Sequence, residues 1–121
     1  MADIKTSLQN ALSIDGCIGV ALVDYESGLC LGMAGSPGFD LELAAAGNAE
    51  VVRAKKSIRD KLEISDKIED ILISLSGQYH LIRMIGTGMF LYCVLDRAKS
   101  NLALARKDLA TIDKKLDIER A

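Results

Sequence analysis

Apolar residues occupy both faces of the first extended segment of the chain. Residues 16–35, GCIGVALVDYESGLCLGMAG, hold two apolar runs separated by a polar turn at 24–28, a pattern that predicts a β-hairpin. A strand with one face in water alternates apolar and polar side chains. The run 17–23 instead places apolar or small residues on both sides. We therefore expect other elements of the fold to cover both faces of the hairpin.

Helical spacing marks three further segments. Residues 4–12 predict a short helix, with Asp3 as its N-cap and Gly16 beyond its end. Residues 41–62 contain no breaker except Gly47 and predict a helix of about six turns. The closing segment predicts a helix whose apolar residues recur every three or four positions, namely Leu102, Ala105, Leu109, Ile112 and Leu116.

The extended segments 71–75, 79–85 and 89–95 are joined by short turns and predict a β-meander. The resulting order is α-β-β-α-β-β-β-α. It predicts a single α+β domain over residues 1–121 with a profilin-like arrangement. We expect a five-stranded antiparallel sheet with the long helix on one face and the two terminal helices on the other.

Composition narrows the classes of function. Hydrophobic residues make up 50% of the 121 residues, a surplus that indicates either a homo-oligomer or simply an Ala-rich chain. The formal net charge of −2 argues against a nucleic-acid-binding protein. No window is apolar enough to predict insertion into a membrane. Three cysteines within apolar runs are typical of small buried side chains in a reducing compartment, so we expect a cytoplasmic protein.

Candidate chemistry is sparse. A hydrolase could use His80 with Asp70 and with Ser74 or Ser76, but no Gly-x-Ser-x-Gly turn is present. His80 is better interpreted as a strand residue that either lies at the solvent edge or is hydrogen-bonded. The glycine groups lack the Lys-Ser/Thr that follows a phosphate-binding loop. Acidic pairs such as those at 69–70 and 113/117 are interpreted as solvated charges, and Met33 as core filler. We expect no enzyme activity, no cofactor and no metal site.

Three stretches together carry a resemblance to a known family: GCIGVALVDYESGLCLG, LELAAAGNAEVVRAK and VLDRAKSNLALARKDL. The chain resembles the Roadblock family of dynein light chains and of bacterial and archaeal small-GTPase regulators. The resemblance implies a homodimer or heterodimer in which two sheets join edge to edge and the long helices pack side by side. It also implies a scaffold or regulator of a small Ras-like GTPase. The alternative is a sensory or small-ligand-binding module of profilin-like or PAS-like architecture.

The predicted helix 41–62 fits such a dimer because it has two apolar aspects. One, formed by Leu41, Ala45, Val52 and Leu62, is expected to lie on the sheet. The other is a strip that would let a second helix approach closely, formed by Leu43, Ala46, Gly47 and Ala54. Such a strip can also be ordinary filling of a helix surface.

Two further features indicate contacts with other proteins. The strand 71–75 would leave an apolar edge unpaired, so we expect its residues Ile71, Ile73 and Leu75 in a dimer interface. Basic residues crowd the second half of the long helix: Arg53, Lys55, Lys56 and Arg59. They form either a docking patch for an acidic partner or a solvated flank that the helix dipole favours.

Overall fold

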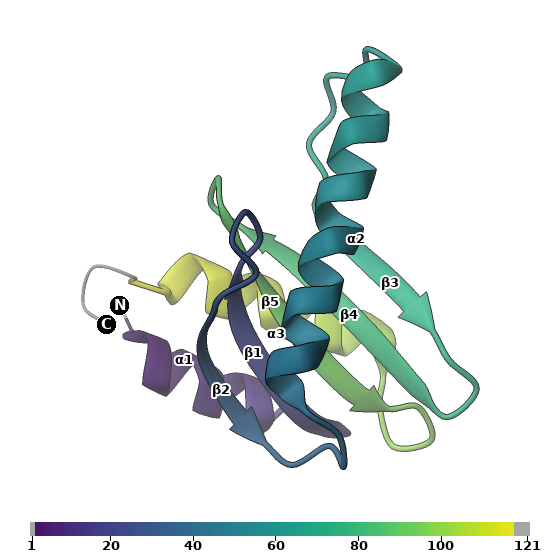
Figure 1. The fold of residues 1–121 in the computed structure, drawn as a ribbon. Coiled ribbons are helices and arrows are strands. Elements are labelled where there is room, and N and C mark those ends of the chain that lie inside the picture. Colours follow the sequence, from purple (N-terminus) through teal and green to yellow (C-terminus); the bar gives the residue numbers. More distant parts are fainter. Residues whose placement is uncertain (1, 118–121) are drawn as a thin grey trace.

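The computed structural model describes residues 2–117 and contains three helices and five strands (Figure 1). In chain order the elements are α1 (Ile4–Leu12), β1 (Cys17–Asp24), β2 (Cys30–Gly35), α2 (Leu41–Lys61), β3 (Asp70–Ser74), β4 (Gln78–Ile85), β5 (Met89–Asp96) and α3 (Leu102–Lys115). The predicted order of elements is confirmed.

The strands form one antiparallel sheet in the order β2-β1-β5-β4-β3. Helix α2 crosses one face of this sheet, and α1 and α3 lie behind the other face (Figure 1). The expected α+β arrangement is therefore confirmed. The order also makes β2 and β3 the two edge strands.

Two apolar layers hold the fold together, one on each face of the sheet. The layer beneath α1 and α3 includes Leu8, Val20, Leu22 and Leu109, and the layer beneath α2 includes Ala21, Val23, Val52 and Tyr92. Successive residues of β1 alternate between the two layers. This explains why the run 17–23 lacks polar positions, since residues 19–23 are buried.

Helix α2 begins at an aspartate cap and is anchored on the sheet by its first half. The Asp40 carboxylate accepts hydrogen bonds from the backbone N–H groups of Glu42 and Leu43, at 2.9 and 3.1 Å. Its buried residues are Leu41, Ala45, Ala49 and Val52. Val52 is the last of them along the chain, and the C-terminal part of the helix extends beyond the sheet as a projecting arm (Figure 1). The prediction that Leu62 packs on the sheet is wrong, because Leu62 lies at the end of this arm and is 62% exposed.

Two ion pairs fasten α3 to the far half of the sheet. Arg106 of α3 contacts Asp70 of β3 at 2.9 Å, and Arg83 of β4 contacts Asp113 of α3 at 3.3 Å. The interpretation of the acidic groups as solvated charges is therefore wrong for Asp70 and Asp113, whose side chains are about three-quarters buried. No helix within residues 2–117 is long and apolar enough to cross a membrane.

Candidate protein-interaction site

An exposed apolar seam runs along α2. Its residues follow one another at steps of four, four, three, four and four: Leu43, Gly47, Val51, Ala54, Ile58 and Leu62. At the helical period of 3.6 residues these positions share one face, turned away from the sheet. Leu43 is 72% exposed, Ile58 48% and Val51 39%. Large apolar side chains repeated along one exposed face are typical of a surface that packs on another helix.

The seam contains three of the four residues expected in the helix strip. Leu43, Gly47 and Ala54 lie in it, whereas Ala46 lies on the other flank of α2, where its Cα stands within 3.6 Å of an ideal Cβ on Gly28. Sequence reasoning missed Val51, Ile58 and Leu62. The signal was available, because the six positions repeat every 11 residues (43/54, 47/58 and 51/62).

The seam is turned away from the sheet and does not share the flank of α2 that contacts the β1–β2 turn. Another flank of α2 contacts the β1–β2 turn through Arg53. The Arg53 guanidinium donates hydrogen bonds to the carbonyl oxygens of Tyr25 and Glu26. Beyond α2, away from that turn, lie β4 and then β3 (Figure 1). β3 pairs only with β4, so its outer backbone groups have no strand partner among residues 2–117.

The residues expected at this edge lie where they can take part in a contact. Ile71 and Ile73 are partly buried against the apolar layer beneath α2, and Leu75, just past the end of β3, is 44% exposed. The strand is thus an unpaired edge with apolar side chains beside it. An unpaired apolar edge of this kind is expected to pair with another strand.

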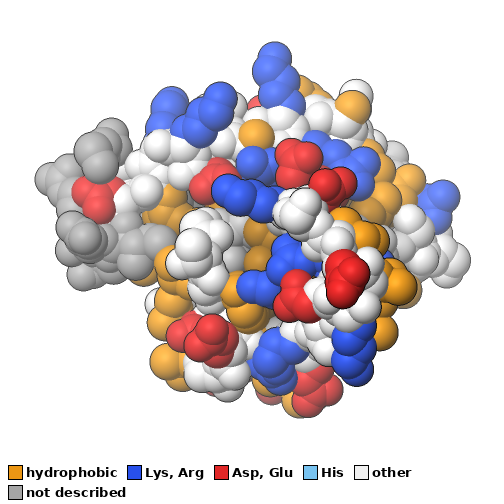
Figure 2. All heavy atoms as spheres, turned by 90° about the horizontal axis from the view of Figure 1, so that it is seen from above, with side chains coloured by type: hydrophobic (Ala, Val, Ile, Leu, Met, Phe, Trp, Pro, Cys, Tyr) orange, Lys and Arg blue, Asp and Glu red, His pale blue; other side chains and the backbone are white. Residues whose placement is uncertain are grey.

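The basic residues of α2 do not form one free patch. Arg53 binds the β1–β2 turn, Lys56 donates to the Tyr25 hydroxyl at 2.5 Å, and Arg59 pairs with Asp60 at 2.9 Å. Lys55 is exposed on another flank. Figure 2 shows the molecule from the projecting end of α2, where blue basic side chains are interspersed with red acidic ones. Two of the four residues therefore anchor the arm to the hairpin.

A small polar cluster lies beneath α2 around His80. Its ring nitrogens bond to Gln78 Oε1 at 2.8 Å and to the Tyr92 hydroxyl at 2.9 Å, so the interpretation as a hydrogen-bonded strand residue is confirmed. Burial lowers the pKa of His80, and burial raises the pKa of Tyr92 to about 12. Asp70 is bound to Arg106 instead, so the structure does not assemble the triad considered above.

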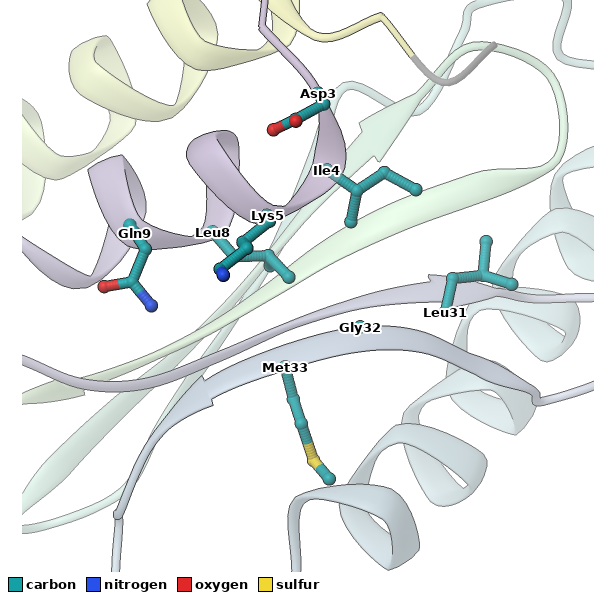
Figure 3. A pocket seen from close by; sticks show the side chains of 8 residues that line it. All are labelled: Asp3, Ile4, Lys5, Leu8, Gln9, Leu31, Gly32 and Met33. Atoms are coloured by element: carbon teal, nitrogen blue, oxygen red, sulfur yellow. The ribbon is translucent and has the colours of Figure 1, made fainter. Parts of the chain in front are cut away.

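A pocket of about 360 Å³ lies between α1 and the edge strand β2 (Figure 3). Ile4 and Leu8 line it from α1, and Leu31, Gly32 and Met33 line it from β2. Lys5 and Gln9 add polar groups from α1. The prediction of Met33 as core filler is wrong, because β2 is an edge strand and leaves Met33 48% exposed. Within residues 2–117, no three His, Cys, Asp or Glu side chains are grouped to hold a metal ion.

The sheet order, the long helix across one face and the two terminal helices on the other define the Roadblock/LC7 fold. The Roadblock/LC7 domain from Streptomyces avermitilis matches with a TM-score of 0.82 and 14% identity, over 94% of each chain. The match to MglB of Myxococcus xanthus has a TM-score of 0.75 and 19% identity, over 91% of this chain and 85% of that one.

A further match is an MglB structure described as having a tetrameric arrangement, with a TM-score of 0.69, 17% identity, and 92% and 88% of the two chains covered. No protein-family model matches the sequence, and no curated protein does. The resemblance found in the sequence is thus confirmed at the level of the fold.

Proposed function

We propose that this chain forms a homodimer that acts as a scaffold or regulator for a small Ras-like GTPase, without a catalytic site of its own. The observation that carries the proposal is the presence in one chain of an exposed apolar seam on α2 and an unpaired strand edge at β3. A twofold axis beside β3 would pair two copies of the edge and bring the two seams together.

The seam suits contact with a second copy of itself. Gly47 and Ala54 have little or no side chain, so two helix backbones can approach closely there. The larger side chains of Leu43, Ile58 and Leu62 would fill the space on either side. Removing one such side chain from water contributes about 1.5–3 kcal/mol when burial is complete. Backbone pairing at β3, with Ile71, Ile73 and Leu75 beside it, would extend the interface.

The proposed GTPase partner is supported by the fold and by the sequence resemblance, whose family includes regulators of small GTPases. The dimer would present both projecting arms together, and Arg53, Lys55, Lys56 and Arg59 would lie on those arms. Lys55 is exposed and, unlike Arg53 and Lys56, is not bound to the hairpin, so it is the member best placed to meet an acidic partner. We place this assembly in the cytoplasm.

The dimer is tested by Ile58→Asp, with Ser57→Asp as the matched control. Both substitutions add one negative charge to exposed positions of the same helical turn, but only Ile58 lies in the seam. We expect light scattering coupled to size exclusion to give a dimer mass for the wild type and Ser57→Asp and a monomer mass for Ile58→Asp. A monomeric wild type would refute the dimer, and equal masses for the two variants would refute the seam as its contact surface.

The partner is tested by capture of small Ras-like GTPases loaded with GDP or with a non-hydrolysable GTP analogue. A regulator must contact the two nucleotide states differently, so we expect one state to be retained more strongly. Lys55→Glu should weaken that retention, and Lys5→Glu on α1 should not. Equal capture of both states, or of neither, would contradict regulation.

The pocket between α1 and β2 supports a second candidate, a small-ligand-binding module. Its volume of about 360 Å³ is within the range of small-molecule sites, and most of its lining is apolar. A Cβ at position 32 would come within 2.9 Å of Leu8 Cδ1, so Gly32→Ala would fill part of the pocket. Native mass spectrometry that finds a retained small molecule, lost in Gly32→Ala, would favour this function.

A further inference from the structure

Two cysteines that are 76 positions apart in the sequence meet on the sheet face beneath α1 and α3. Cys17 is the first residue of β1 and Cys93 lies in the middle of β5, with 3.5 Å between their Sγ atoms. Cys17 is paired with Leu95, two residues from Cys93, so the two thiols meet on a diagonal between the strands. A register shift between Cys17 and Gly19 accompanies this diagonal contact. The third cysteine, Cys30, lies in β2 and packs against the other apolar layer, the one beneath α2.

The two thiols differ in exposure and in pKa, as expected of a pair in which one sulfur reacts first. Cys17 is partly exposed, whereas Cys93 is fully buried. The hydrogen bond from the Cys93 thiol lowers the pKa of Cys17, and the same contact, together with burial, raises the pKa of Cys93. Cys17 is therefore the sulfur that reaches the thiolate form and meets solvent. Burial raises the pKa of Cys30, which bonds to the Gly32 carbonyl oxygen and not to another thiol.

The gap between the sulfurs is short enough for a bond to form with local adjustment. A disulfide requires about 2.05 Å between sulfurs, so the pair must close by about 1.5 Å. Cys17 lies at the end of its strand, between Gly16, whose φ is +83°, and the register shift. Adjustment at Cys17 leaves the regular pairing of residues 20–23 with β5 in place.

We propose that Cys17 and Cys93 form a dithiol modification site that hydrogen peroxide converts to an intramolecular disulfide. The Cys17 thiolate attacks one peroxide oxygen, the O–O bond breaks, and with one proton the products are Cys17 sulfenic acid and water. The Cys93 sulfur then attacks the Cys17 sulfur, and the hydroxyl leaves as water with the Cys93 proton. Two electrons pass from the two sulfurs to one peroxide, and a dithiol reductant restores both thiols.

This site is independent of the proposed dimer and of its partner. Cys17 and Cys93 belong to the layer beneath α1 and α3, on the face opposite α2, and neither lies in the seam or in β3. The disulfide would tie the start of β1 to the centre of the sheet.

The test treats the purified full-length chain with hydrogen peroxide, alkylates the remaining thiols and analyses non-reduced peptides by mass spectrometry. We expect free thiols to fall from three to one, the mass to fall by about 2 Da, and one peptide pair to be linked through Cys17 and Cys93. Dithiothreitol should reverse the change. Intact thiols at peroxide concentrations that oxidise free cysteine, linkage through Cys30, or links between chains only would overturn the proposal.

Three variants separate the roles of the cysteines. Cys30→Ser should form the same disulfide, and Cys17→Ser should form none. Cys93→Ala should leave a sulfenic acid at Cys17, which dimedone traps as an adduct. If Cys93→Ala does not fold, the first two variants still decide, because Cys17→Ser changes a partly exposed residue. A disulfide that persists in Cys17→Ser would refute the assignment.

Discussion

Two neighbouring valines of α2 offer the sharpest test of which face of the helix packs on the sheet. Val52 is fully buried in the layer beneath α2, whereas Val51 is 39% exposed in the seam. Val52→Asp and Val51→Asp are chemically identical changes at adjacent positions of one helix. Any effect of helix propensity or net charge is therefore nearly the same for both.

The structure gives the two substitutions very different costs. Val52→Asp loses about 1.5–3 kcal/mol of apolar burial, and placing an unpaired carboxylate there costs several kcal/mol more. Typical domains are stable by about 5–15 kcal/mol, so we expect Val52→Asp to unfold the chain or to lower its melting temperature by at least about 15 °C. Val51→Asp keeps the carboxylate in contact with water and should retain the fold of the protomer.

Circular dichroism melting curves and the mass in solution distinguish these outcomes. Val52→Asp should lose the cooperative transition or show it at a temperature lower by at least about 15 °C. Val51→Asp should keep a cooperative transition and, if the proposed dimer is correct, have a monomer mass. A wild-type melting profile for Val52→Asp, or equal unfolding of the two variants, would refute the orientation of α2. An unchanged mass for Val51→Asp would count against the seam as the contact surface.

Two further predictions concern the backbone and pH. Gly35 has a φ of +90°, and a Cβ there would lie 2.6 Å from the Ile18 carbonyl oxygen, so Gly35→Ala should destabilise the fold by about 1–3 kcal/mol or more. Gly77→Ala meets nothing within 4 Å and should melt like the wild type; similar melting of both variants would contradict this. Because burial lowers the pKa of His80, the unfolded chain binds a proton more readily, and this contribution to stability is lost as pH falls from about 6.5 through the folded pKa. Between about pH 7 and pH 5, the melting temperature of the wild type should therefore fall by more than that of His80→Gln. An equal fall in the two proteins would refute this role of His80.

The fold was predictable because local patterns and tertiary packing agree. β1 lacks polar positions because two layers cover it, and the α2 residues Leu41, Ala45 and Val52 lie on the sheet as expected. The misassignment of Leu62 has a physical cause. Periodicity gives the direction of a side chain around the helix axis, but it does not say where along the helix the sheet ends.

The contacts that sequence reasoning missed are those set by register and by side chains from distant elements. Cys17 and Cys93 come together through a register shift, which no alternation of side chains encodes. Arg106 reaches Asp70 because α3 lies behind β3 and β4, and the sequence carries no spacing rule for such a pair. The α2 seam was found only in part because small and large residues alternate along it.

The strand order also bears on the ways in which copies of the sheet could join. A sheet with two unpaired edges could stack copies end to end without limit if β2 of one copy joined β3 of the next. β2 is a poor template for such growth, since it contains Gly32, ends at Gly35 and is irregular where Cys30 meets β1. In the proposed dimer, joining β3 to its own copy would use up that edge in both copies, and the assembly would stop at two chains.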